Sequence, residues 1–380
     1  MKIDAVILAG GLGTRLRSVV SDVPKCMASV AGQPFLYHIL RQLADSGIIS
    51  RVILSVGYLK ETIQDWVEAH AGEFPFEFGW AVDDEPLGTG GAIKCAMQKV
   101  KGERALVMNG DTISDIDFKN LVENAQDSPL TVALIDVEDA GRYGSVSLSD
   151  NGRILSFSEK SQGGKALVNA GVYVIDKNSC LFDGLEGRFS FENDVLVPQS
   201  RKGNVKGRRA GKSFIDIGIP RDYYRACFQM VDPGDYDTIL LDRDGVINVL
   251  LPGDYVKTWD EFVFLPGIRE AVARWTEKGK SIYIVTNQRG VGKGIFSQEA
   301  LESIHARMME EIEKCGGRID GIYACTAASD DDPRRKPAKG LFDDILRDHP
   351  EVDPARTLML GDSPSDEAFA ANCNIKFIKI

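Results

Sequence analysis

Two aspartates that bracket a single arginine follow a short apolar run early in the second half of the chain. Asp242, Arg243 and Asp244 come directly after residues 238–241 (TILL), and Gly245 follows them. Carboxylates this close repel each other, and an ionised carboxylate at the end of a buried strand is costly without a partner. The pair is therefore a candidate for chemistry that needs two carboxylates.

A second candidate site lies near the N-terminus, in residues 6–16 (VILAGGLGTRL). Three glycines follow a strand-like apolar run there, and glycines allow a backbone with free amides to approach a phosphate closely. Arg15 and Lys25 add positive charge. A glycine loop alone is weak evidence, because such loops also serve as plain tight turns.

The composition is that of an ordinary globular protein. The 380 residues are 43% apolar and 27% charged, and their number suggests two domains or one large one. The apolar runs are too short to cross a bilayer, and the N-terminal run lacks the features of a secretory signal, so we expect a cytoplasmic protein with no membrane partner. A formal charge of −11 argues against nucleic-acid binding but allows anionic substrates, because local cations and backbone amides can reverse the field in a cleft.

The cysteines and histidines form no motif of their own. The seven cysteines are scattered and make no CxxC pair, which favours reduced thiols. The four histidines match no motif, and we expect them to be solvated or at the edge of a core.

Short apolar runs alternate with helical patterns along the chain, as is typical of parallel sheets with crossover helices. A stretch rich in Pro, Gly and Asp at 229–237 interrupts this alternation, so we place the boundary at about 231–236 and expect domains 1–230 and 236–380, each a three-layer α/β unit. The expected strands are 5–8, 51–56, 105–108, 130–135, 168–175, 238–241, 281–285, 321–325 and 357–360, and the expected helices are 34–46, 59–70, 90–100, 267–278, 298–315 and 340–348.

The first domain contains a series of motifs whose order and spacing agree with one known family. They are LAGGLGTRL (8–16), VPKCM (23–27), EPLGTGGA (85–92), NGD (109–111), FSEKS (157–161), NAG (169–171), FSFENDVLV (189–197) and FIDIGIP (214–220). The series resembles the sugar-phosphate nucleotidyltransferases, which join a sugar 1-phosphate to a nucleoside triphosphate and release pyrophosphate. The resemblance covers about residues 1–228, is closest to the heptose 1-phosphate guanylyltransferases, and implies a Rossmann-like, GT-A-like mixed sheet.

This resemblance implies an in-line attack by a sugar phosphate oxygen on the α-phosphate, which brings several negative charges together. Asp111 and Asp216 would hold Mg²⁺, a hard ion that suits carboxylates and phosphates. Arg15 and Lys25 would stabilise the triphosphate and pyrophosphate. The nucleotide would contact Leu8, Ala9, Gly10, Gly11, Gly13, Thr14, Leu87, Gly88 and Thr89, and the sugar phosphate would contact Asn109, Gly144, Glu159, Lys160, Asn169 and Glu192.

Several of these residues have simpler roles when they are taken singly. Asp111 could be a turn residue after a strand, and Asn169 could satisfy a bend. Lys160 could be a solvated charge, and Glu192 and Asp194 could be acids at a helix N-terminus. The joint pattern argues against these simpler roles most strongly for Asp111.

The second domain resembles the haloacid dehalogenase (HAD)-type phosphatases over about residues 235–380, which implies a HAD-like Rossmannoid fold. The motifs are LLDRDGVIN (240–248), IVTNQRGVGKG (284–294), RRKP (334–337) and LMLGDSPSD (358–366). By this resemblance Asp242 would attack phosphorus, and Asp244 would protonate the leaving alcohol and then activate water. Mg²⁺ would bind Asp242, the backbone carbonyl of Asp244, and Asp362. Thr286 and Asn287 would contact the phosphoryl oxygens, Lys336 would bridge nucleophile and phosphate, Arg335 would contact the far end of the substrate, and Asp366 would support the metal ligands or cap a helix.

The likeness within this family is closest to heptose 1,7-bisphosphate and histidinol-phosphate phosphatases, whose members commonly carry a Cys/His zinc loop before the RKP segment. Here the stretch is YACTAASDDDPRRKP (323–337), with only Cys325 and no nearby histidine. Asp332 and Arg334 stand where cysteines would be expected. A structural zinc needs about four ligands, so we expect no zinc, and Cys325 is most simply a core thiol.

Together the two resemblances imply a bifunctional enzyme with Mg²⁺ in both domains. The second domain would remove the 7-phosphate from heptose 1,7-bisphosphate, and the first would join the heptose 1-phosphate to GMP from GTP, the favoured nucleotide, to form GDP-heptose. The alternatives are another sugar 1-phosphate such as mannose 1-phosphate, another nucleotide, a histidinol-phosphate-like phosphatase, or a non-catalytic second domain. The sequence does not determine the oligomeric state, and a homo-oligomer is compatible with it.

Overall fold

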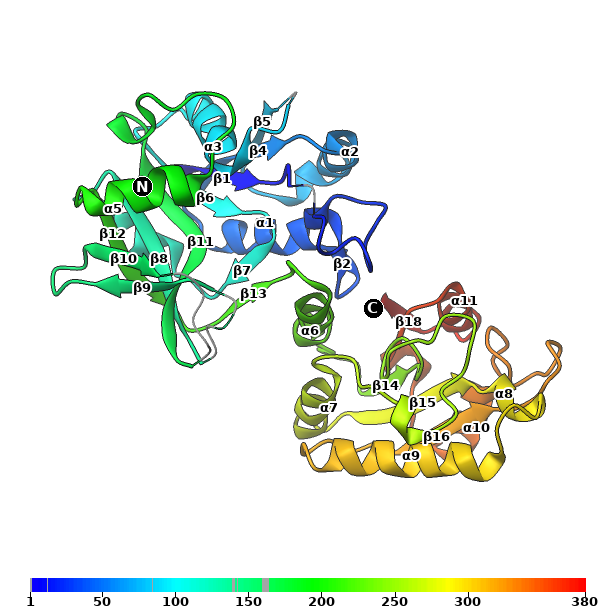
Figure 1. The fold of residues 1–380 in the computed structure, drawn as a ribbon. Coiled ribbons are helices and arrows are strands. Elements are labelled where there is room, and N and C mark those ends of the chain that lie inside the picture. Colours follow the sequence, from blue (N-terminus) through cyan, green and yellow to red (C-terminus); the bar gives the residue numbers. More distant parts are fainter. Residues whose placement is uncertain (1, 12, 84, 139–140, 142, 159–163) are drawn as a thin grey trace. The chain divides into compact units, whose positions relative to one another are not determined.

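The computed structural model describes residues 2–11, 13–83, 85–138, 141, 143–158 and 164–380 (Figure 1). The chain divides into two compact units. The first comprises residues 1–28 and 34–220, and the second comprises residues 29–33 and 221–380. In the part of the chain that is described, no helix combines the length and apolar character needed to span a membrane.

The first unit is built on a nine-stranded mixed sheet (Figure 1). The main order is β10-β9-β11-β6-β1-β4-β5, and β8 pairs with both β11 and β12. Strands β6, β1, β4 and β5 are parallel, whereas β11 is antiparallel to β6, β8 and β9. The strands are β1 (Ile3–Leu8), β4 (Ile49–Val56), β5 (Glu77–Val82), β6 (Arg104–Asn109), β8 (Leu130–Val137), β9 (Ser145–Leu148), β10 (Ile154–Ser158), β11 (Ala166–Asp176) and β12 (Val205–Gly211).

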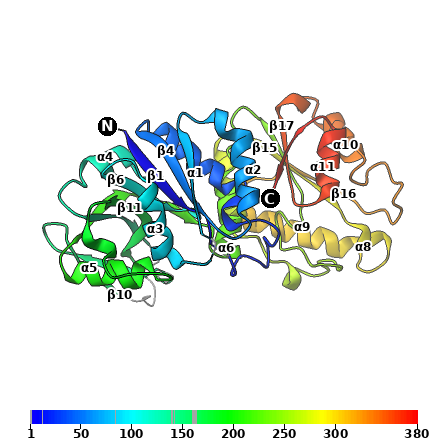
Figure 2. The ribbon, with the colours of Figure 1, turned by 90° about the horizontal axis from the view of Figure 1, so that it is seen from above.

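Helices cover both faces of the parallel part of this sheet. Val6 of β1 and Val107 of β6 share a core with Ile93 and Met97 of α3, and alternate strand residues point to the opposite face, where Figures 1 and 2 show α1. The helices of this unit are α1 (Phe35–Asp45), α2 (Lys60–His70), α3 (Gly88–Lys99), α4 (Phe118–Glu123) and α5 (Val197–Arg201), and β7 (Thr112–Ser114) pairs with β13 (Phe214–Asp216). The predicted elements of the first half are all present, and the sheet is mixed, as the family resemblance implied.

The second unit has a five-stranded parallel sheet in the order β16-β15-β14-β17-β18. Leu241 and Ile284 on one face pack with Trp275 of α7 and Met308 of α9. The other face of the sheet packs against α10 and α11, which confirms the three-layer prediction (Figure 2). The elements are β14 (Thr238–Leu241), α7 (Ile268–Glu277), β15 (Ser281–Asn287), α8 (Arg289–Gly292), α9 (Gln298–Glu313), β16 (Gly321–Cys325), α10 (Gly340–Asp348), β17 (Thr357–Gly361), α11 (Pro364–Asn372) and β18 (Lys376–Lys379).

Two segments that precede the expected boundary belong to the second unit. Helix α6 (Pro220–Met230) places Phe228 in the core of the second unit, and Val231 follows it there. The small hairpin of β2 (Ser29–Val30) and β3 (Gln33–Pro34) also contributes, because Ala31 packs against this core and the Tyr223 hydroxyl donates to the Ser29 carbonyl at 2.7 Å. By contacts, the second compact unit therefore begins at Arg221 and includes residues 29–33, because apolar contacts between residues distant in sequence join these segments to its core.

Two candidate active sites

Three acids of the second unit lie together at the carboxyl end of its sheet. Asp242 follows β14 and Asp362 follows β17, and these parallel strands are paired at Leu241 and Leu360. Asp366 lies in the first turn of α11. Carboxylate oxygens of the three acids lie within 4.8 Å of one another. The structure thus brings Asp242 to two acids that lie about 120 residues further along the chain.

The surroundings of these acids favour a bound cation. Burial is the main cause that raises the pKa of Asp242 well above its ordinary value. Burial, followed by the charge of Asp366, raises the pKa of Asp362 to about 6. A hard divalent ion prefers carboxylate oxygens and offsets the repulsion between them. The donor set at Asp242 and Asp362 therefore fits Mg²⁺.

Lys336 is the cation that the structure itself places among the acids. Its buried ammonium lies 2.8 Å from Asp242 Oδ1 and 2.6 Å from Asp366 Oδ1, and it donates to the Val285 carbonyl at 2.9 Å. Burial alone would lower the pKa of Lys336, but the two carboxylates raise it above its ordinary value. Asp366 also forms a capping box with Ser363 at the start of α11. The expected helix cap is therefore confirmed, and the same carboxylate also contacts Lys336.

Asp244 is held by three donors that the sequence analysis did not single out. Its carboxylate accepts hydrogen bonds from Arg243 Nη2 at 3.0 and 2.9 Å, from Asn248 Nδ2 at 2.9 Å and from Gln288 Nε2 at 2.9 Å. Burial would raise the pKa of Asp244, but the Arg243 charge and these hydrogen bonds together lower it below its ordinary value. Asp244 is therefore ionised in this arrangement. The only sequence signal for the donors was their position inside the motifs DRDGVIN and TNQ.

The guanidinium of Arg243 is fully buried beside a histidine. Arg243 Nη1 lies 3.4 Å from His305 Nε2. Burial, and then the positive charge of Arg243, lowers the pKa of His305 to about 4, so this histidine is neutral near pH 7. Because the ring is neutral, the charged partner of Arg243 here is the Asp244 carboxylate.

The loops after β15 and β16 are joined at the predicted phosphate site. Asn287 Nδ2 donates to the Lys336 carbonyl at 3.0 Å, and the Lys336 amide donates to Asn287 Oδ1 at 3.0 Å. The buried Thr286 hydroxyl accepts from Gln288 Nε2 at 2.8 Å. Asn287 thus holds Lys336 in place, a contact that the motif alone did not reveal.

We expect Gly245→Ala to lower phosphatase turnover about 10²-fold, the scale of a misplacement of about 1 Å. Gly245 has φ +88°, and a Cβ there would lie 2.0 Å from Asp362 Oδ2, so the carboxylate must move. The matched control is Gly253→Ala, which has φ +75° and no atom within 4 Å of the added Cβ. Phosphate release by the two purified variants, at matched thermal stability, measures the effect. Equal activities would show that the close contact with Asp362 is not important.

In the first unit, Lys25 lies between two acids from different segments. Asp111 follows β6 and β13 ends at Asp216, which pairs with Thr112 of β7. Lys25 Nζ forms a short contact with Asp111 Oδ2 and lies 3.9 Å from Asp216 Oδ1. Two partly buried carboxylates that share one cation form a donor set that also fits Mg²⁺.

The glycine loop begins where β1 ends, beside β6. Leu8 and Asn109 are paired across these parallel strands, and a Cβ at Gly110 would lie 2.5 Å from the Leu8 carbonyl oxygen. Gly13 has φ +57° and abuts Lys25. The predicted residues Ala9, Gly10, Gly11, Thr14 and Arg15 continue this loop, and Arg15 is exposed.

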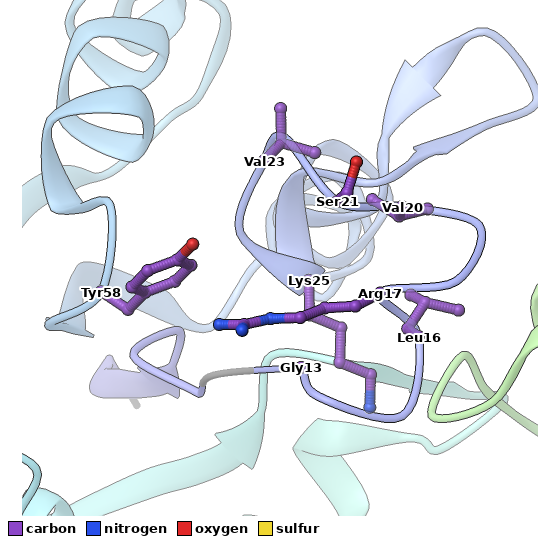
Figure 3. Close-up of a pocket in the computed structure, with 8 residues that line it drawn as sticks. All are labelled: Gly13, Leu16, Arg17, Val20, Ser21, Val23, Lys25 and Tyr58. Atoms are coloured by element: carbon purple, nitrogen blue, oxygen red, sulfur yellow. The ribbon is translucent and has the colours of Figure 1, made fainter.

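Figure 3 shows a small pocket beside the loop. Its volume of about 10 Å³ is room for one water molecule. Arg17, which the sequence analysis did not single out, lies over the Tyr58 ring at 5.3 Å and forms part of the wall with Lys25. The pocket is too small for a nucleotide, so it marks one side of the predicted site only.

Two further predicted segments pack directly against each other. Gly88 begins α3, and the Thr89 hydroxyl accepts from the Phe191 amide at 3.0 Å. The Phe189 amide donates to the Leu87 carbonyl at 3.0 Å. This packing fixes the segment expected near the base to the segment that carries Glu192, whose side chain is exposed.

The predicted sugar-contacting residues are only partly brought together. Asn169 supports a bend in β11, because its Oδ1 accepts from the Gly171 amide at 2.9 Å while its Nδ2 donates to the Tyr173 hydroxyl. A Cβ at Gly171 would lie 2.5 Å from Asn109 Nδ2. Asn109 and Asn169 therefore both lie beside Gly171. Gly144 packs beside the Ser158 carbonyl. Glu159 and Lys160 lie outside the described residues.

Comparisons with known proteins agree with this geometry. Residues 4–232 match the nucleotidyl transferase family, and residues 172–374 match the haloacid dehalogenase-like hydrolase family. The chain is 39% identical to D-glycero-alpha-D-manno-heptose 1-phosphate guanylyltransferase of Aneurinibacillus thermoaerophilus over 59% of this chain and 96% of that protein. It is 40% identical to D-glycero-alpha-D-manno-heptose-1,7-bisphosphate 7-phosphatase of Mycobacterium bovis over 35% of this chain and 71% of that protein.

A solved structure gives the same result for the first half. The crystal structure of HddC from Yersinia pseudotuberculosis complexed with GMP-PN matches 60% of this chain and all of that chain, with 40% identity and a TM-score of 0.55. The chain therefore belongs to the nucleotidyl transferase family through its first half and to the haloacid dehalogenase-like hydrolases through its second half.

Proposed function

We propose that this chain is a bifunctional enzyme that makes GDP-D-glycero-D-manno-heptose from heptose 1,7-bisphosphate and GTP. The observation that carries the proposal is the presence of two separate groups of acids around a lysine, Lys25 in the first unit and Lys336 in the second. Relatives of the two halves are named for the two consecutive activities. We assign nucleotidyl transfer to residues 1–230 and phosphate removal to residues 236–380.

In the phosphatase, a carboxylate oxygen of Asp242 attacks the 7-phosphorus and the bond from phosphorus to the sugar oxygen breaks. Before this step Asp244 takes up a proton from solvent, and it then delivers that proton to the leaving oxygen. In the second step it takes a proton from the water that hydrolyses the aspartyl phosphate. The hydrogen bonds that keep Asp244 ionised suit this second step. Lys336, paired with Asp242, neutralises charge on the phosphoryl group.

In the transferase, an oxygen of heptose 1-phosphate attacks the α-phosphorus of GTP, and pyrophosphate leaves in line. Asp111 and Asp216 would hold Mg²⁺, while Arg15 and Lys25 would neutralise the phosphates. In both sites the bound Mg²⁺ would offset negative charge on the phosphate groups. The phosphate substrates and seven free thiols fit a reducing, cytoplasmic setting.

We expect one reaction to contain both products. Purified protein, Mg²⁺, GTP and D-glycero-α-D-manno-heptose 1,7-bisphosphate should yield inorganic phosphate and GDP-heptose, identified by mass spectrometry. Phosphate without a nucleotide sugar would contradict the sugar or base assignment, and mannose 1-phosphate and other nucleotides would then be tested. If the protein released phosphate from histidinol phosphate but not from heptose 1,7-bisphosphate, the heptose assignment of the second half would be contradicted. The absence of phosphate release from every substrate would identify the second half as non-catalytic.

A further inference from the structure

We infer that an ion cluster of Asp330 with Arg289 and Arg335 holds the loop between β16 and α10 in the place of a zinc ion. This makes Asp330 a positioning residue for the phosphatase, an inference that rests on the proposed function. The loop runs from Thr326 to Lys339 and contains Arg335 and Lys336, and Lys336 contacts Asp242.

The residues of this loop do not fit a zinc ion. Cys325 is buried, and its Sγ lies 3.7 Å from Asp332 Oδ1. Across the residues whose placement is described, the one group of three or more potential metal ligands is Asp242, Asp362 and Asp366. One thiol and one carboxylate are half of a structural zinc site at most. Something else must order the loop.

The two ends of the loop are fixed by close backbone packing. At the start, a Cβ on Gly292 of α8 would lie 2.4 Å from the Thr326 carbonyl oxygen and 2.6 Å from the Ala328 amide. At the far end, the Gly340 amide donates to the Pro333 carbonyl at 2.9 Å. Figure 2 shows α8 and the loop between β16 and α10 at the same end of this unit. The middle of the loop needs a different constraint.

Asp330 supplies that constraint, because one carboxylate contacts two guanidinium groups. Arg289 Nη1 lies 2.8 Å from Asp330 Oδ1, and Arg289 Nη2 donates to Oδ2 at 3.1 Å. Arg335 Nε lies 3.2 Å from the same Oδ1. Arg289 Nε also donates to the Ala328 carbonyl at 2.8 Å. The loop after β15 and the loop after β16 are thus joined through one acid.

A single exposed ion pair contributes little to stability. Here one carboxylate pairs with two arginines, and both arginines are largely buried. The Asp330 side chain is 69% exposed, whereas the side chains of Arg289 and Arg335 are only 27% and 19% exposed. The two-point contact restricts Arg289 in direction as well as distance, and the single contact through Nε limits the distance of Arg335. Arg335 precedes Lys336 in sequence, so a restraint on Arg335 also restrains the backbone of Lys336, whose ammonium contacts Asp242.

The test compares Asp330→Asn with Asp331→Asn. Both changes remove one exposed carboxylate from the same loop, and Asp331 has no ion pair among the described residues. We expect the rate of amide hydrogen exchange in residues 326–335 to rise about 3- to 10-fold in Asp330→Asn but not in Asp331→Asn. The same rise is expected in the native protein at 1 M salt, because salt screens the ion cluster. The zinc chelator 1,10-phenanthroline should leave exchange unchanged. Equal exchange in the two variants, or stoichiometric zinc whose removal loosens the loop, would overturn the inference.

Kinetics separate this inference from the proposed function. For heptose 1,7-bisphosphate, Asp330→Asn should raise KM about tenfold and change kcat less than twofold, because a loosened Arg335 weakens binding more than chemistry. Asp331→Asn should match the native protein. If the native protein does not turn over the bisphosphate, the proposed function fails while the exchange result still decides the role of Asp330. If the native protein hydrolyses the bisphosphate and Asp330→Asn has the same KM as the native protein, the positioning role of Asp330 is contradicted.

Discussion

Asp242→Asn should reduce phosphate release from heptose 1,7-bisphosphate by at least ~10³-fold, the usual cost of removing a nucleophile. The amide has nearly the shape of the carboxylate, but it cannot form the aspartyl phosphate. It also removes one of the two carboxylates that hold the Lys336 ammonium. Phosphate release by the purified variant, followed with heptose 1,7-bisphosphate and Mg²⁺, measures the loss.

The same variant should keep nucleotidyl transfer when it is supplied with heptose 1-phosphate and GTP, because Lys25, Asp111 and Asp216 belong to the other unit. Asp235→Asn, an exposed change in the second unit, is the control for both assays. Loss of both activities at an unchanged melting temperature would contradict independent sites.

Asp111→Ala should have the opposite result, with GDP-heptose formation reduced by at least ~10³-fold and phosphatase turnover retained. Asp111 makes the shortest contact with Lys25, and its removal leaves Asp216 as the one acid of the pair. An electrostatic site that loses one of two charged groups loses much of its ability to stabilise a crowded phosphate transition state. Pyrophosphate release from GTP and heptose 1-phosphate measures this activity.

Two comparisons make the second test more precise. Asp111→Asn keeps the size of the side chain and should be nearly as inactive, which separates charge from packing. Asp150→Ala, an exposed change in the same unit, should behave as the native protein. An active Asp111→Ala enzyme with an unaltered Mg²⁺ requirement would remove Asp111 from the proposed metal site.

The sequence predicted the regular elements well because hydrophobic periodicity reflects burial. The predicted bounds of β14 and α10 agree with the structure at both ends. The acids at 242 and 362 could be placed near each other because the carboxyl ends of parallel strands meet at one edge of a sheet. Motif order supplied the rest of that expectation.

Contacts that depend on side-chain direction could not be predicted in the same way. Arg243, Asn248 and Gln288 surround Asp244, yet each would read in sequence as an ordinary polar residue near a turn. For Asn169 the sequence left two roles open, a sugar contact and the support of a bend, and the Gly171 amide bond shows the bend. Such outcomes depend on rotamers and on partners far away in the chain, which periodicity does not report.

The hairpin at residues 29–33 and helix α6 have a consequence for how such a gene could arise or be divided. The chain passes from one unit to the other three times, after residues 28, 33 and 220. A coding sequence cut once near codon 231 would separate Ala31 and Phe228 from the apolar core that they help to fill. A phosphatase encoded alone would need substitutes for these side chains. A gene for the second half alone would therefore have to include, or replace, segments encoded within the first half.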